Sequence, residues 1–214
     1  MKEKTILFDF DGTVADTVGP IVEILNEIAD DFGFPQIDGE ILERFRNKEN
    51  REALKYALEK GKIPKYKVPL IIKRVWSEIH KKIATWQPID GMKEALLSLK
   101  RDGYQLGIVT TGSKRNVIKF LEGNEMEYFD FIYGGKSLFG KEKILQDLLK
   151  SHNLHPEEVF YIGDQTSDIE AARSVGIRSI AVTWGFNSEE ILRKHNPDGF
   201  VTTPNDLEDV FKSL

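Results

Sequence analysis

The chain has 214 residues, of which 40% are hydrophobic and 30% charged, and its formal net charge is -5. This composition is typical of a folded globular protein and argues against disorder, and the length suits one large domain or a core with a smaller insertion. The acidic balance disfavours a nucleic-acid partner, and the absence of cysteine excludes disulfides, zinc–thiolate sites and thiol catalysis.

Apolar residues 6–8 predict a first buried strand, which ends at an acidic turn. A secretory signal would need a longer apolar stretch and a cleavage site of small residues. No later apolar run approaches the length of a membrane span. We therefore expect a cytoplasmic protein that has no membrane partner.

Helical patterns alone fill the following segment. They run over residues 20–32, 39–45, 49–60 and 65–85, and the first and third of these helices are closed by Gly33 and Gly61. No strand pattern interrupts them. We interpret residues 16–85 as an all-helical domain inserted into a catalytic core that is made of residues 1–15 and 86–214.

Strands and helices alternate from residue 90 onward. Helices are predicted over residues 92–101, 114–122, 141–152 and 169–175, strong strands over 106–109, 159–162 and 179–182, and weaker strands over 129–133 and 199–201. This alternation predicts an α/β fold with a doubly wound parallel sheet and right-handed crossovers. Ligands of such sheets bind beyond the carboxyl ends of the strands.

The first strand runs directly into the motif Asp9-Phe10-Asp11-Gly12-Thr13. Two carboxylates that are two positions apart, where a strand opens into a glycine turn, can both reach the edge of the sheet. Gly12 allows the sharp turn and exposes backbone amides. Four fixed letters in five positions make this pattern specific even without the rest of the chain.

Two later strands also end on polar residues. One ends at Thr110-Thr111-Gly112-Ser113 before a helix, where a hydroxyl and the amides of a helix start suit a phosphate oxygen, although Ser113 could be a plain N-cap. The other ends at Gly163-Asp164, and Asp168 follows in the first turn of the next helix, where its charge could simply favour the helix N-terminus.

These polar residues converge if the sheet is as predicted. Asp9, Asp11, Thr110 and Asp164 all follow strands at the same edge. A carboxylate cluster without histidine or cysteine selects Mg²⁺ over zinc. The sequence therefore predicts a magnesium site at this edge of the sheet.

The motifs at residues 9–17, at the strand that ends in Thr110, and at residues 163–172 together resemble the haloacid dehalogenase superfamily, in its phosphatase members with a helical cap after the first motif. The resemblance covers nearly the whole chain and implies a Rossmann-like core with the cap inserted at residues 16–85. It also implies that the protein hydrolyses a phosphorylated small-molecule substrate through an aspartyl-phosphate.

The resemblance implies residue roles as well. Asp9 would be the nucleophile and Asp11 the general acid and base; Mg²⁺ would be held by Asp9, the carbonyl of Asp11 and Asp164, with Asp168 supporting the site. The expected phosphate-binding residues are Gly12, Thr13, Thr110, Thr111 and Lys141.

Two lysines are candidates for the family lysine, because the prolines that often follow it are absent here. Lys141 follows Gly140 at a helix start and is the first choice, and Lys143 is the alternative.

Several functions remain open on sequence alone. A phosphomutase of the same capped type would keep both acids of the first motif, whereas a dehalogenase would lack the second. A phosphoacceptor signalling module would be shorter and would lack the helical insertion, and a catalytically silent binding protein would not need the intact acids. Neither the substrate nor the oligomeric state can be read from these patterns.

Overall fold

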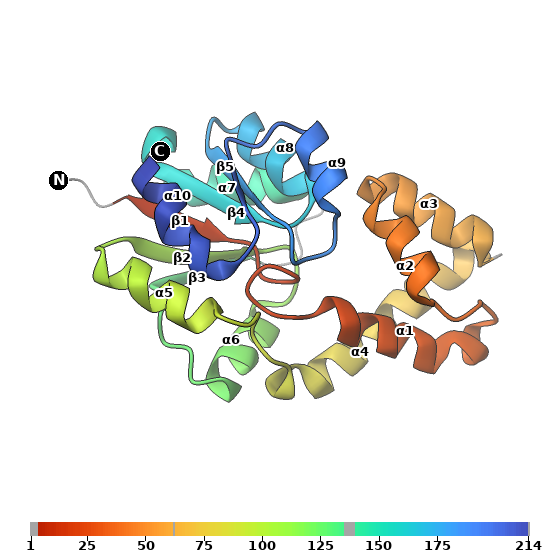
Figure 1. The fold of residues 1–214 in the computed structure, drawn as a ribbon. Helices are drawn as coiled ribbons and strands as arrows, with labels where there is room; N and C mark the ends of the chain where they lie inside the picture. Colours follow the sequence, from red (N-terminus) through yellow and green to blue (C-terminus); the bar gives the residue numbers. More distant parts are fainter. Residues whose placement is uncertain (1–3, 62, 135–139, 214) are drawn as a thin grey trace.

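Figure 1 shows the computed structural model of the chain, which describes residues 4–61, 63–134 and 140–213. Its centre is a parallel sheet with the strand order β3-β2-β1-β4-β5-β6. The strands are β1 Thr5–Phe8, β2 Gln105–Thr110, β3 Phe131–Gly134, β4 Val159–Gly163, β5 Arg178–Val182 and β6 Gly199–Val201. Because β1 lies between β2 and β4, the direction of winding reverses at the end of β1, where ligands of such sheets bind. The predicted doubly wound α/β fold is confirmed.

Helices cover both faces of the sheet. They are α5 Met92–Arg101, α6 Lys114–Gly123, α7 Gly140–Ser151, α8 Thr166–Ser174, α9 Glu189–Lys194 and α10 Leu207–Ser213, with short 3₁₀ turns at η3 Pro156–Glu158 and η4 Pro204–Asp206. Successive strand residues point to opposite faces. On β1, Ile6 and Phe8 pack in the cluster that contains α5, α6 and α10, whereas Leu7 packs in the cluster that contains α7 and α8.

The helices α1 Val18–Phe32, α2 Gly39–Arg46, α3 Asn50–Lys60 and α4 Val68–Lys82 lie beside the sheet (Figure 1). The segment predicted as helical over residues 65–85 is helical throughout, as α4 with the 3₁₀ turns η1 Lys65–Lys67 and η2 Ile83–Thr85 at its two ends. Pro69 fits the first turn of α4, because it has no N–H to donate. None of the described helices is both long and apolar enough to span a bilayer.

The chain enters and leaves these helices at one place. Asp16 N–H donates to the Gln87 carbonyl at 3.0 Å, and Ile89 N–H donates to the Val14 carbonyl at 3.0 Å. The entering and leaving segments therefore run side by side as a short antiparallel pair, so the helical segment is attached to the sheet by one narrow connection.

Candidate active site

The end of β1 brings two carboxylates to the carboxyl edge of the sheet. Asp9 N–H donates to the Ile162 carbonyl of β4 at 2.8 Å, and the Asp9 side chain is buried. The chain then turns at Gly12, whose φ of +78° is left-handed and favours glycine. Asp11 lies on this turn, where Thr17 donates a hydrogen bond to its carboxylate. Burial nevertheless raises the pKa of Asp11 above its ordinary value, which favours the protonated carboxyl.

Lys141, in the first turn of α7, pairs with two carboxylates. Its Nζ lies 3.0 Å from Asp9 Oδ2 and donates a second hydrogen bond to Asp168 Oδ1. Burial disfavours the ammonium form, but Asp168 and Asp9 outweigh burial and raise the pKa of Lys141 well above its ordinary value. Lys143 instead pairs with Asp147 at 2.7 Å on an exposed helix surface. Of the two candidate lysines, Lys141 is the one that lies beside the acids.

Asp164 follows β4 and is completely buried. The Thr13 hydroxyl donates to its Oδ1 at 3.0 Å, and Phe186 N–H donates to its Oδ2 at 2.6 Å. A Cβ at Gly12 or Gly185 would lie 2.4 or 2.3 Å from this carboxylate, so the two glycines let the backbone close around it. Burial, reinforced by the charge of Asp168, raises the pKa of Asp164 to about 7.

Asp168 lies in the first turn of α8 and also holds the site together. Its Oδ2 accepts the Gln165 N–H at 3.0 Å, which is one half of a capping box, and its Oδ1 accepts the Tyr161 hydroxyl at 3.1 Å as well as Lys141. Asp168 therefore has two roles. Its charge favours the N-terminus of α8, as the sequence suggests, and its carboxylate belongs to the acidic cluster.

Three of these acids could hold a metal ion. Carboxylate oxygens of Asp9, Asp164 and Asp168 lie within 4.8 Å of one another. Burial raises the pKa of Asp9 well above its ordinary value; Lys141 opposes this shift, and Asp168, Asp164 and Asp11 add to it. One ammonium cannot neutralise three buried carboxylates, so the cluster is short of positive charge. An all-oxygen donor set of this kind fits a hard divalent cation.

Thr110 supplies a hydroxyl on the neighbouring strand. It ends β2, is 1% exposed, and its Oγ1 accepts Gly112 N–H at 2.9 Å, so the hydroxyl proton stays available for a ligand oxygen. A Cβ at Gly112 would lie 3.1 Å from this Oγ1 and 3.6 Å from Asp11 Oδ2. The hydroxyl of Thr110 and the carboxylate of Asp11 therefore approach the same glycine from two strands.

The other expected phosphate contacts have different surroundings. Gly12 N–H donates to the Ala15 carbonyl at 3.0 Å and the Thr13 hydroxyl donates to Asp164, so both donors already have partners within the protein. Thr111 is exposed and lines a cavity together with Asp9 and Asp11. Phosphate binding by these three residues remains a prediction.

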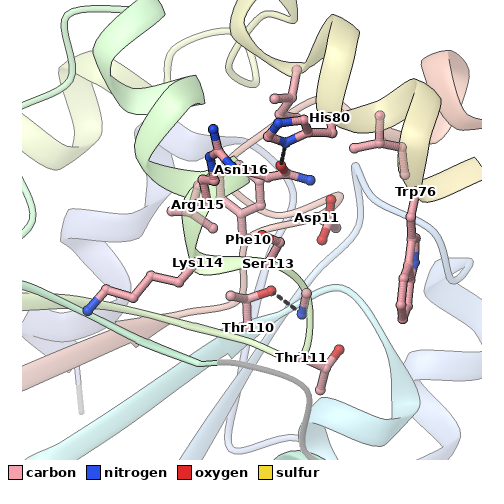
Figure 2. Close-up of a pocket in the computed structure, with 14 residues that line it drawn as sticks. Phe10, Asp11, Trp76, His80, Thr110, Thr111, Ser113, Lys114, Arg115 and Asn116 are labelled. Carbon is pink, nitrogen blue, oxygen red and sulfur yellow. Dashed lines mark hydrogen bonds between the residues drawn. The ribbon is translucent and has the colours of Figure 1, made fainter. Parts of the chain in front are cut away.

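A cavity of about 510 Å³ opens from Asp11 and Thr110 toward the helical segment (Figure 2). Trp76 and His80 of α4 line it opposite the start of α6, and His80 Nδ1 lies 2.7 Å from Asn116 Oδ1. Ser113 also lines this cavity; it stands at the N-cap position of α6, but its side chain makes no capping bond. No sequence pattern singles out His80, because the distance between α4 and α6 has no local signal.

Comparison with known proteins agrees with this geometry. A family model described as haloacid dehalogenase-like hydrolase matches residues 6–182. The phosphoglycolate phosphatase of Synechococcus elongatus is 33% identical over 205 residues, which are 95% of each chain. The solved structure of a haloacid dehalogenase-like hydrolase from Streptococcus pneumoniae is 26% identical, covers 98% of each chain and superposes with a TM-score of 0.84. That of a candidate β-phosphoglucomutase from Thermotoga maritima is also 26% identical, covers 99% of each chain and has a TM-score of 0.71. The chain therefore belongs to the haloacid dehalogenase-like hydrolase family and is an enzyme of its phosphatase type.

Proposed function

We propose that the protein hydrolyses a small phosphomonoester in a Mg²⁺-dependent reaction that passes through an aspartyl-phosphate on Asp9. The observation that carries this proposal is the position of Asp9, which lies 3.0 Å from Lys141 and within 4.8 Å of the carboxylates of Asp164 and Asp168. A carboxylate in such surroundings can stay ionised only if positive charge is close to it. The similarity to a phosphoglycolate phosphatase makes 2-phosphoglycolate the first substrate to test.

The proposed reaction has two steps that share Asp11. An Asp9 carboxylate oxygen attacks phosphorus, the bond from phosphorus to the ester oxygen breaks, and Asp11 gives its proton to the departing oxygen. Water then attacks the phosphoryl group on Asp9 while Asp11 takes a proton from it, which releases phosphate and restores the Asp9 carboxylate. The raised pKa of Asp11 favours the protonated form that the first step requires.

Asp9, the Asp11 backbone carbonyl and Asp164 would hold Mg²⁺, and Asp168 would hold Lys141 in place. When bound, the cation would neutralise charge on the phosphoryl oxygens. Lys141 and the Thr110 hydroxyl would bind the remaining oxygens, since phosphoryl transfer depends mainly on positioning and on neutralising oxygen charge.

We further propose that residues 16–85 form a cap on a core made of residues 1–15 and 86–214. The paired segments at Val14–Asp16 and Gln87–Ile89 would be its hinge. Trp76 and His80 of α4 line the cavity beside Asp11, so the cap would contact the leaving group and exclude water from the acyl-phosphate.

The proposal is tested by phosphate release from 2-phosphoglycolate and from a broad panel of phosphorylated metabolites, with Mg²⁺ and with a chelator. We expect release that needs Mg²⁺. Equal release with chelator would refute the Mg²⁺ dependence. No release from any substrate would refute hydrolysis and favour a silent binding protein. Isomerised sugar phosphate without phosphate release would identify a phosphomutase, the alternative that the similarity to a candidate β-phosphoglucomutase supports.

A further inference from the structure

Asn187 connects the loop that carries Asp164 with the helical segment. It is completely buried and follows Phe186, whose N–H donates to the Asp164 carboxylate. A buried amide side chain needs partners for both its oxygen and its nitrogen. In Asn187 the oxygen binds the core and the nitrogen binds the helical segment.

On the core side, Asn187 braces the turn after β4. Its Oδ1 accepts Thr166 N–H at 2.9 Å, and its own N–H donates to the Asp164 carbonyl at 3.2 Å. These two bonds lie on either side of Gln165 and so set the path of the turn from which the Asp164 carboxylate projects.

On the other side, Asn187 caps a helix that is distant in sequence. Its Nδ2 donates to the carbonyls of Arg46 at 3.1 Å and Lys48 at 3.0 Å. Arg46 is the last residue of α2, and the final carbonyls of a helix have no partner inside the helix. Ser188 N–H also donates to the Arg46 carbonyl, at 2.9 Å. The core thus completes the C-terminus of α2.

We infer that Asn187 is a positioning residue that couples docking of residues 46–48 onto the core to the orientation of Asp164. If the helical segment moves away, Nδ2 loses both acceptors at once, and the amide is no longer fixed in the orientation that presents Oδ1 to Thr166. The turn behind Asp164 is then held less firmly. The inference rests on the proposed role of Asp164 as a metal ligand.

Coupling of this kind is reciprocal. If docking helps Asp164 to bind the cation, cation binding must strengthen docking by the same factor. Mg²⁺ alone should therefore slow amide hydrogen exchange at residues 46–49, although the hydrogen bonds described for Arg46 and Lys48 across this contact reach Asn187 and Ser188 and no proposed metal ligand.

Two neighbouring substitutions separate coupling from simple loss of a contact. Asn187→Ala removes the side-chain bonds to both partners. Ser188→Ala is the matched control, because the Ser188 hydroxyl donates to Asn47 Oδ1 at 2.5 Å in the same contact. That hydroxyl makes none of the bonds to residues 164–166 described for Asn187. Thermal melts confirm folding, and Asn187→Ser replaces the alanine variant if that variant unfolds.

Hydrogen exchange with and without Mg²⁺, together with calorimetric Mg²⁺ titration, gives readouts that do not depend on turnover. In Asn187→Ala we expect faster exchange at residues 46–49, loss of the response to Mg²⁺, and Mg²⁺ binding weakened about tenfold, as for other residues that orient a ligand. In Ser188→Ala, Mg²⁺ should still slow exchange at residues 46–49, and the Mg²⁺ affinity should be unchanged.

Equal exchange and equal Mg²⁺ affinity in the two variants would overturn the inference, whether or not the wild-type protein is active. Absence of Mg²⁺-dependent phosphate release in the wild type refutes the proposed function instead, so the two failures are distinguishable.

Discussion

The Nζ of Lys141 lies 3.0 Å from Oδ2 of Asp9 and also donates to Asp168, so a single ammonium sits between two buried carboxylates. Asp9 directly follows β1, whereas Asp168 lies in the first turn of α8 and Lys141 in the first turn of α7. This contact distinguishes the lysine from its neighbours in sequence and gives the first prediction.

Lys141→Ala should lower kcat by about 10²- to 10³-fold, because it removes a cation from charge that develops in the transition state. Lys143→Ala, two positions away, should change kcat by less than about twofold, because exposed pairs such as Lys143–Asp147 contribute little. Steady-state kinetics on the substrate found in the panel measures both. A larger loss in Lys143→Ala would move the assignment to that lysine.

Substitution of Asp9 and substitution of Asp11 should block different steps of the reaction. Asp9→Asn should abolish both turnover and covalent labelling, since an amide is not a competent nucleophile. Asp11→Asn keeps the nucleophile, so an aryl phosphate with an activated leaving group can still phosphorylate Asp9, and the intermediate should accumulate without a base to hydrolyse it. Intact mass measurement should show one added phosphoryl group in Asp11→Asn. A label on the Asp9→Asn protein, at Asp11 or Asp164, would refute Asp9 as the nucleophile.

Removing Mg²⁺ should make stability depend on the ionisation of Asp164. Its pKa is about 7 in the fold against an ordinary 3.8, so the folded state retains a proton that the unfolded state releases. This contribution is fully present below the unfolded pKa and is lost as the pH rises through the folded pKa, so the free energy of unfolding should fall between about pH 4 and pH 7.

Denaturation in chelator over this range measures the effect, and Asp164→Asn is the control that should have a shallower slope. Because the cation binds the ionised carboxylate, its apparent affinity should weaken roughly tenfold per unit below about pH 7. The same slope in the two proteins would contradict the prediction.

Gly12→Ala should destabilise the fold and impair Mg²⁺ binding. A Cβ there would lie 2.4 Å from Asp164 Oδ2, and the φ of +78° is strained for alanine, so a loss of about 1–3 kcal/mol is expected in the free energy of unfolding. Gly39→Ala is the matched control, because Gly39 is the first residue of α2 and nothing lies within 4 Å of a Cβ there. The control should gain up to about 1 kcal/mol from helix propensity. Thermal and denaturant unfolding measure the stability of both variants. An unchanged free energy of unfolding in Gly12→Ala would show that the loop is not tightly closed around Asp164.

Much of the fold could be predicted because its signals are local. The helix over residues 92–101 has the predicted bounds, and the weak strand patterns near residues 131 and 199 are indeed β3 and β6. The short helices α9 and α10 were missed, since six or seven residues carry too little periodicity to separate them from loops. α8 begins at Thr166, three positions before the predicted start, because the capping box of Gln165 and Asp168 sets its first turn.

By itself, the sequence determined the elements and the order in which they place acids and hydroxyls at strand ends. Parallel strands collect such residues at one edge, so Asp9, Asp11, Thr110 and Asp164 could be grouped before any coordinates were known. Only the tertiary structure decided that Lys141 lies beside Asp9. It also decided that the Gly12 N–H and the Thr13 hydroxyl already donate hydrogen bonds within the protein. It alone also revealed that Asn187 touches both Arg46 and Thr166. The physical reason is that these contacts join residues far apart in the chain through side chains of common types, and no local pattern encodes the distance between them.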